Sequence, residues 1–368
     1  MDYFHHNEPV KVVITRDWIT ACNISQSELG IQNPLIITSK GNLSRLKLDN
    51  KFKHESLYSN TVPNPTFESC SELINFSLGK NFDGVIAIGG GSVMDASKSV
   101  MAAMGTDIDD IEELIKLKHL FNPHVPAIFI PTTHGTGSEV TMWGTIWDFQ
   151  EGKKHSLSHP ILYPDVAILD GNLTLSLSLD ISLTTVLDSL SHCLESIWNK
   201  GKNSKSTEYA IRAINLIFDN IEELKANPLE LSIRENFLNA SNLAGLAFSK
   251  TKTAAAHSIS YPLTIHFNIP HGIASSITLP ALLRINESLI LEELSTIYND
   301  LRISGIDEFI ELIYGIPEDH LKFKLSDWGV KPGHTETLVS QCFTKGRMDN
   351  NIVDLDERQV RSILESCL

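Results

Sequence analysis

The stretch "GVIAIGGGSVMDASKSV", residues 84–100, places three consecutive glycines, Gly89 to Gly91, between two segments of different character. The apolar, β-branched residues before them are typical of a buried strand, and those after them fit a helix. Glycines at such a turn let the backbone approach a phosphate, and the helix N-terminus offers free N–H groups. The pattern is neither G-x-G-x-x-G nor a P-loop, so a dinucleotide-binding turn and a tight turn without a ligand both remain open.

Four other short apolar runs in the first half of the chain are bounded by turn residues and separated by spacers of helical length. They are "VKVVIT" (10–15), "PLIIT" (34–38), "VPAIFIPTT" (125–133) and "DVAILD" (165–170). Such runs predict parallel strands buried within an α/β sheet. The second half differs, because residues 207–226 repeat apolar positions at helical spacing and no comparable strand follows. We therefore predict an α/β domain over residues 1–175 and an all-α domain over residues 176–368.

A second loop favours the dinucleotide interpretation of the glycine run. "PTTHGTGSEVT", residues 131–141, also follows a predicted strand, and it carries the hydroxyls of Thr132, Thr133, Thr136 and Ser138. Two loops at the carboxyl ends of neighbouring parallel strands line the crevice where open α/β sheets bind ligands. We expect both loops to contribute to one nucleotide site.

A different chemistry is indicated in the second half. In "TTVLDSLSHCLESIW" (184–198), Asp188 and His192 lie four residues apart, so in a helix they share one face. Alone, such a pair is more typical of a simple ion pair. However, "HSISYPLTIHFNIPH" (257–271) supplies three more histidines. One carboxylate with imidazoles suits Fe²⁺ or Zn²⁺, with positions left open for a substrate oxygen.

Composition excludes several classes of partner. The 368 residues include 30 basic and 45 acidic ones, and the net charge of −15 argues against nucleic acid or an anionic membrane surface. The five cysteines show no CxxC spacing, so neither a disulfide framework nor a cysteine zinc site is expected. Because neither a signal peptide nor an apolar run long enough for a membrane helix is visible, we expect a cytoplasmic protein.

Taken together, the motifs resemble the iron-containing (group III) alcohol dehydrogenase family over nearly the whole chain. The motifs that occur in that family's order and spacing are "VPNPT" (62–66), "GGGSVMDASK" (89–98), "PTTHGTGSEVT", "LDSLSHCLES" (187–196) and a histidine followed fourteen residues later by the histidine of "PHG" (270–272). The resemblance implies an N-terminal Rossmann-like domain, an all-α C-terminal domain, a bound Fe²⁺ or Zn²⁺, NAD(P)H and a homodimer. It assigns the metal ligands to Asp188, His192, His257 and His271. The implied cofactor-binding residues are Asn64, Gly90, Gly91, Ser92, Asp95, Thr132, Thr133 and Lys154.

Two departures from the family pattern affect the cofactor and the proton route. Ser39 stands where relatives often have an aspartate that bonds the adenosine ribose, and Lys40 follows it. Loss of that negative charge predicts that NADPH is accepted as well as NADH. Tyr261 stands where many relatives have a histidine that relays a proton. A phenol can pass a proton, but with an ordinary pKa of about 10 it is a poorer base at neutral pH.

His266 matches no ligand position. A hydrogen-bonded polar residue and a substrate-facing residue are both open interpretations of it.

A third departure concerns the substrate. Lys250 and Lys252 precede the metal-ligand position His257, where relatives commonly have neutral residues. Most lysines are solvated, but in an acidic protein two extra cations could attract a doubly charged substrate. Together with "SISYPLT" and "EVTMWGTIWD", they resemble the phosphonoacetaldehyde reductases. The sequence thus predicts reduction of a small aldehyde to a primary alcohol, with phosphonoacetaldehyde and 2-hydroxyethylphosphonate as candidates. The alternatives are another short-chain alcohol or aldehyde oxidoreductase of the same family, a dehydroquinate-synthase-like lyase and a non-catalytic binding protein.

Overall fold

The computed structural model describes residues 2–4, 8–104, 106, 108–116 and 124–368. The chain divides into two compact units. The first consists of residues 1–133 and 138–174, and the second of residues 134–137 and 175–368. Most of the loop 131–141 therefore belongs to the first unit, while its residues 134–137 belong to the second.

The first unit is built on a seven-stranded sheet with the strand order β1-β2-β9-β6-β5-β3-β4. Its strands are Asp2–Phe4, Lys11–Ile14, Pro34–Ile37, Leu57–Tyr58, Gly84–Gly89, Ala127–Pro131 and Val166–Leu169, for β1, β2, β3, β4, β5, β6 and β9 respectively. All pairs are parallel except β1 with β2. The five strands predicted from apolar runs, β2, β3, β5, β6 and β9, are confirmed.

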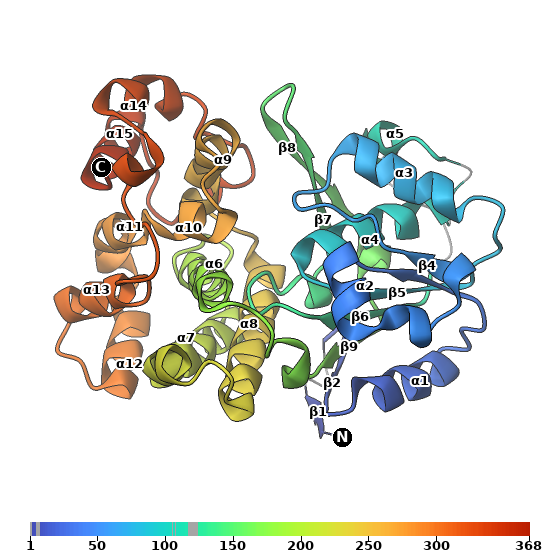
Figure 1. The fold of residues 1–368 in the computed structure, drawn as a ribbon. Coiled ribbons are helices and arrows are strands. Elements are labelled where there is room, and N and C mark those ends of the chain that lie inside the picture. Colours follow the sequence, from blue (N-terminus) through green and yellow to red (C-terminus); the bar gives the residue numbers. More distant parts are fainter. Residues whose placement is uncertain (1, 5–7, 105, 107, 117–123) are drawn as a thin grey trace. The chain divides into compact units, whose positions relative to one another are not determined.

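Helices cover both faces of this sheet (Figure 1), as expected for parallel strands that are apolar on both sides. On one face, α3 (Phe67–Ser77), α4 (Gly91–Met104) and α5 (Ile111–Lys116) bury a core with Phe129 of β6. On the other face, α1 (Trp18–Glu28) packs against Ile128 and Ile168. The sheet is thereby fixed from both sides, and its carboxyl ends carry the loops that the sequence singled out.

A hairpin of β7 (Trp143–Asp148) and β8 (Lys153–Ser158) also belongs to the first unit. Its strands pair in antiparallel fashion, and Trp147 N–H donates to Pro65 O at 2.7 Å. The apolar runs used to predict the sheet did not include these strands. The hairpin brings Lys154 onto the Trp147 ring, 5.2 Å from its centroid.

The second unit contains helices and no strand among its described residues, as predicted. The longest helices are α6 (Leu179–Ile197), α7 (Ser204–Ala226) and α8 (Leu231–Thr251), followed by α9 (Ala255–Phe267) and α10 (His271–Ser276). The chain continues with α11 (Leu279–Asn286), α12 (Leu291–Leu301), α13 (Ile306–Gly315), α14 (Pro332–Val339) and α15 (Glu357–Ser366). Across the described residues, no helix combines the length and apolar character that crossing a bilayer requires.

Residues 134–137 are anchored within the second unit by buried polar contacts. The buried Arg234 donates through Nη1 to His134 Nε2 at 3.3 Å and to Ser182 Oγ at 2.5 Å. His134 Nδ1 lies 3.2 Å from Thr185 Oγ1. Since Arg234 can only donate, the His134 ring is neutral and carries its proton on Nδ1. Gly137 completes the fit, because its φ is +54° and a Cβ there would lie 2.4 Å from Gly245 Cα.

The neutral state of His134 makes stability depend on pH. Burial, followed by the Arg234 charge, lowers its pKa from 6.5 to about 3. The unfolded chain binds a proton below about pH 6.5 and the folded chain does not, so stability is complete above that pH and is lost as pH falls toward 3. The variant His134→Gln keeps one acceptor and one donor. Between pH 7 and pH 5, we expect the free energy of unfolding of wild type, measured with urea, to fall by about 2 kcal/mol more than that of this variant.

The exposed His320 provides the control, since His320→Gln removes a histidine without touching this network. Equal pH dependence of wild type and His134→Gln would contradict the assignment.

Candidate metal centre

One face of α6 presents three buried polar side chains, Asp188, His192 and Glu195. They follow each other at spacings of four and three residues, so they lie above one another on the helix. Ser178 starts this helix by accepting a hydrogen bond from Ile181 N–H, which fixes its first turn. The sequence pointed to the first two residues, and the structure confirms that both lie in a helix.

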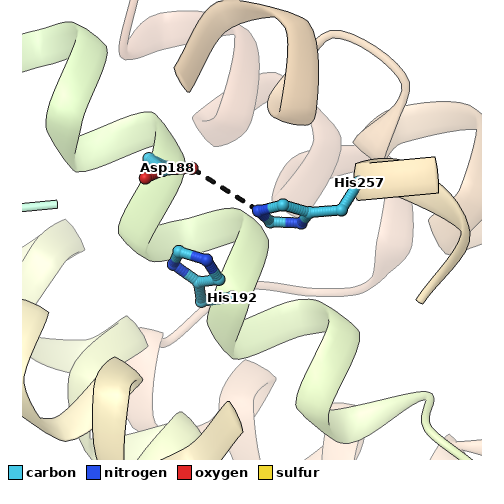
Figure 2. A group of neighbouring side chains, drawn as sticks. All are labelled: Asp188, His192 and His257. Carbon is cyan, nitrogen blue, oxygen red and sulfur yellow. Dashed lines mark ion pairs between the residues drawn. The ribbon is translucent and has the colours of Figure 1, made fainter. Parts of the chain in front are cut away.

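The remaining predicted ligands come from α9 and α10. His257 Nε2 lies 3.6 Å and His271 Nε2 lies 3.8 Å from Asp188 Oδ1. The His192 ring stacks on the His257 ring with centroids 4.6 Å apart. The structure thus brings together all four residues, and Figure 2 shows Asp188, His192 and His257 turned toward one another.

Glu195 holds His257 in a single orientation. Its two carboxylate oxygens accept from the backbone N–H of His257, at 3.0 Å, and from Nδ1 of the same residue, at 2.5 Å. Glu195 is fully buried, so this pairing is shielded from water. Because Glu195 accepts the proton on Nδ1, Nε2 is the ring atom directed toward Asp188, and a metal ion would take its lone pair in place of a proton.

The arrangement of donors fits a divalent metal ion. One ligand atom from each of Asp188, His192 and His257 lies within 4.8 Å of the others. Donors around one ion with bonds of about 2.1 Å are separated by roughly 3–4 Å, which the two measured separations from Asp188 Oδ1 match. His257 Nε2 is buried and has no hydrogen-bond partner among the described residues. A bound metal ion would give this nitrogen a partner, whereas a cluster that only stabilised the fold would leave it without one.

The charges of the cluster also favour a cation. Burial alone would raise the pKa of Asp188, but the neighbouring His192, His271 and His257 outweigh burial and hold it below its usual range. Burial would lower the pKa of His257, but Glu195 and Asp188 outweigh burial and raise it to about 9. Two buried carboxylates thus stabilise positive charge at this point, which a divalent ion can supply.

Further contacts support the ligands. Ser275 Oγ donates to Asp188 Oδ1 at 3.1 Å, and the Phe248 ring stacks on His192 with centroids 4.2 Å apart. Gly272 must be glycine, because a Cβ there would lie 2.0 Å from Thr184 O, and this close approach places the start of α10 against α6. These contacts fix the first turn of α10, where His271 lies.

The predicted cofactor-binding residues all belong to the first unit, and several of them meet there. Asn64 N–H donates to Ser92 Oγ at 3.1 Å, and Asn64 adopts a left-handed φ of +53°. A Cβ on Gly90 would lie 2.9 Å from Thr133 Oγ1. Residues 89–91 (the glycine loop) thus approach residues 131–141 (the threonine loop) at a point where a side chain would clash. The two loops therefore meet at the carboxyl ends of β5 and β6.

A buried lysine fixes the second half of the threonine loop. Lys98 Nζ donates to Ser138 O at 2.8 Å, to Thr141 Oγ1 at 3.0 Å and to Trp143 O at 2.7 Å. Burial lowers the pKa of Lys98 to about 8. Asp95 accepts from Ser138 Oγ at 2.8 Å, so this predicted cofactor residue is tied to the same loop.

The remaining residues that the sequence singled out lie on different elements. Ser39 caps the next helix by accepting from Asn42 N–H at 3.3 Å. Lys250 and Lys252 are exposed at the end of α8. Tyr261 is buried one turn after His257 on α9. His266 is exposed and hydrogen-bonded to Gln341 Oε1 at 2.6 Å, as the interpretation of a satisfied polar residue expects.

Comparison with known proteins identifies the family. Residues 9–171 match the model described as "Iron-containing alcohol dehydrogenase", and residues 182–368 match "Fe-containing alcohol dehydrogenase family, C-terminal". The chain belongs to the iron-containing alcohol dehydrogenase family. It is thus an oxidoreductase of the alcohol dehydrogenase and aldehyde reductase type, as the sequence motifs predicted.

Individual relatives span nearly the same length. The chain is 30% identical over 324 residues to long-chain-alcohol dehydrogenase 1 of Geobacillus thermodenitrificans, covering 84% of this chain and 81% of that protein. It is 27% identical over 325 residues to sulfoacetaldehyde reductase of Bilophila wadsworthia, with 84% and 83% covered. The crystal structure of sulfoacetaldehyde reductase from Bifidobacterium kashiwanohense in complex with NAD⁺ matches with a TM-score of 0.89, at 25% identity over 100% of this chain and 99% of that one.

Sequence reasoning missed Glu195 and Ser275 in this iron-type centre. Glu195 had a visible signal, since it continues the face of Asp188 and His192 at helical spacing within the quoted motif. Its role was hidden because its partner, His257, lies 62 residues further along the chain. Ser275 carried no comparable signal, because nothing in the sequence marks one serine among many as the donor to Asp188.

Glu195 provides a direct test of the metal centre. In Glu195→Gln, the amide offers one acceptor where His257 presents two donors, so either the backbone N–H loses its partner or the imidazole changes tautomer. We expect metal affinity to fall by roughly 10–100-fold. Competition with a chelator, followed by metal analysis, measures the effect.

The matched control is Glu208→Gln, which alters an exposed glutamate on α7 that pairs with Arg212. Wild-type metal affinity in Glu195→Gln, with an unchanged thermal midpoint of the metal-free protein, would contradict the role assigned to Glu195.

Proposed function

We propose that this protein reduces a small, negatively charged aldehyde to a primary alcohol with hydride from NADH or NADPH, and that phosphonoacetaldehyde is the candidate substrate. The observation that carries the proposal is the buried group of Asp188, His192 and His257, with His271 beside it. Family membership gives the reaction type, and the departures from the family pattern give the candidate substrate class.

The metal centre supplies the polarising group for a carbonyl. When bound, Fe²⁺ or Zn²⁺ would act as a Lewis acid toward an aldehyde oxygen. The chain's own contribution is to present one carboxylate and three imidazoles from α6, α9 and α10, with Glu195 holding the His257 ring. Buried supports keep these donors from reorganising, as a preorganised site requires.

The first unit contributes the proposed nicotinamide-cofactor residues. NAD(P)H supplies the hydride when bound. Gly90 and Gly91 leave room for the pyrophosphate at the start of α4, and the hydroxyls of Thr132 and Thr133 lie on the adjoining loop. The other proposed cofactor-binding residues are Ser92, Asn64, Asp95 and Lys154. The complex of a sulfoacetaldehyde reductase with NAD⁺, whose fold matches over the whole chain, supports the assignment.

Tyr261 is proposed to deliver or orient the proton that the product alcohol acquires. It follows His257 by one helical turn on α9, so both side chains leave the same side of that helix. Its hydroxyl belongs to a buried residue, where water has limited access. Tyr261 thus takes the place of the histidine of other family members, with a phenol in place of an imidazole.

A negatively charged substrate is supported by two observations. Lys250 and Lys252 are exposed and therefore accessible to a ligand, and they precede His257 by seven and five residues. Two relatives are named sulfoacetaldehyde reductase, and sulfoacetaldehyde carries a sulfonate on a two-carbon aldehyde. Phosphonoacetaldehyde has the same carbon skeleton with a phosphonate, so both compounds belong in one substrate panel.

Removal of His257 tests the metal-dependent reaction. In His257→Ala we expect loss of bound metal and a fall of more than about 100-fold in aldehyde-dependent oxidation of NAD(P)H. His266→Ala, which alters an exposed histidine of the same helix, is the control and should keep both properties.

Full turnover of wild type or His257→Ala after chelation would refute a role for the metal. Stoichiometric metal without net oxidation of NAD(P)H on any aldehyde would favour the lyase or binding-protein alternatives.

The two lysines test the charge of the substrate. In Lys250→Ala/Lys252→Ala we expect KM for phosphonoacetaldehyde to rise about tenfold, while KM for propanal stays unchanged. The control Lys324→Ala/Lys345→Ala removes the same charge from exposed positions elsewhere in the second unit. Equal increases in KM for the charged and the neutral aldehyde would exclude a specific role for the two lysines.

A further inference from the structure

Two residues of α2 (Lys40–Leu46), Asn42 and Arg45, form a polar pair at the carboxyl edge of the sheet. Asn42 is buried, and its Nδ2 donates to Ile88 O at 3.4 Å and to Thr132 Oγ1 at 3.3 Å. Ile88 lies near the end of β5, and Thr132 directly follows β6. Both donor contacts point to the sheet, so the amide oxygen of Asn42 is turned toward its own helix.

That oxygen holds Arg45. Arg45 Nη2 donates to Asn42 Oδ1 at 2.5 Å, and the arginine side chain is only partly buried. Because an amide is neutral, the contact with Asn42 orients the guanidinium and brings no opposite charge of its own. The guanidinium has five N–H donors in a planar fork, and this fork matches the oxygens of a phosphate group.

The position of this cation relative to the strands suggests its ligand. In doubly wound α/β sheets, the residue at the end of the second strand meets the adenosine ribose, and an arginine nearby accommodates a 2′-phosphate. Here Ser39 follows β3 closely, and its hydroxyl accepts from Asn42 N–H at 3.3 Å. The end of β3 thus carries no carboxylate that would repel a phosphate, while Arg45 lies on the helix that begins there.

We propose that Arg45 binds the 2′-phosphate of NADPH and that Asn42 is the positioning residue that aims it. The inference rests on the nicotinamide site proposed above and adds a specificity determinant to it. Lys40 is exposed at the first position of the same helix and assists as a second cation. Arg45 carries the selectivity because a held, planar fork is pre-organised, whereas a solvated lysine is not.

The test uses adenosine 2′,5′-bisphosphate and adenosine 5′-monophosphate, which differ by the 2′-phosphate alone. We expect isothermal titration on the full-length, metal-loaded protein to show that Arg45→Ala raises the Kd of the bisphosphate by at least about tenfold. The Kd of the monophosphate should change by less than about twofold. Asn42→Ala should also raise the Kd of the bisphosphate, but by a smaller factor, since the charge of Arg45 remains. Lys53→Ala, which removes an exposed charge from the same unit, should change neither affinity.

Two results would overturn the proposal. Equal weakening of both nucleotides by Arg45→Ala would mean that Arg45 only supports the fold of α2, and unchanged binding of both would mean that it touches neither. Because these titrations need no turnover, they are separate from the proposed reaction. If the wild-type protein reduced no aldehyde, the proposed function would be refuted. A selective loss of bisphosphate binding in Arg45→Ala would still establish the 2′-phosphate site.

Discussion

The metal centre depends on the buried contact between Glu195 and His257. A carboxylate and an imidazole that are both excluded from water keep a proton on Nδ1, and this orientation directs Nε2 of His257, the nitrogen that would bind a metal, toward Asp188. Asp188, seven residues earlier on the same helix face, adds the second buried negative charge. A cluster of this kind is costly without a cation, so its stability and its chemistry are coupled. α6 itself carries His192, and α10, which packs against α6, carries His271, so all four side chains meet where this coupling can act.

In the first unit, buried polar contacts likewise hold the candidate cofactor-binding loops in place. The turn after β5 has no side chain at Gly90, where a Cβ would meet Thr133, and the loop after β6 is held by hydrogen bonds from surrounding side chains. Lys98 donates to Ser138 and Thr141 of the loop 131–141 and to Trp143 at the start of β7, and Asn42 links Thr132, directly after β6, to α2. Loops held in this way lose little conformational freedom on binding, which favours affinity.

Much of the fold could be predicted from the sequence, because buried parallel strands and long amphipathic helices have distinct periods. The strands β2, β3, β5, β6 and β9 and the helix carrying Asp188 and His192 were visible in this way. The hairpin β7–β8 was not, because "KKHSLS" in β8 is largely polar and one of its faces is solvated. The support of His257 by Glu195 and of Asp188 by Ser275 was hidden for another reason. Hydrogen bonds between residues far apart in sequence leave no local pattern.

The small segment His134–Gly137 has a consequence for how the protein can be divided. The second unit is not a continuous piece of sequence, since these four residues come from the loop between β6 and the hairpin. A fragment starting at residue 175 would retain the buried Arg234 but lack the His134 ring beside it, and it would also lose the loop backbone that accepts from Ser189. The boundary that is natural in the sequence is therefore not one at which the helical unit can be cut intact.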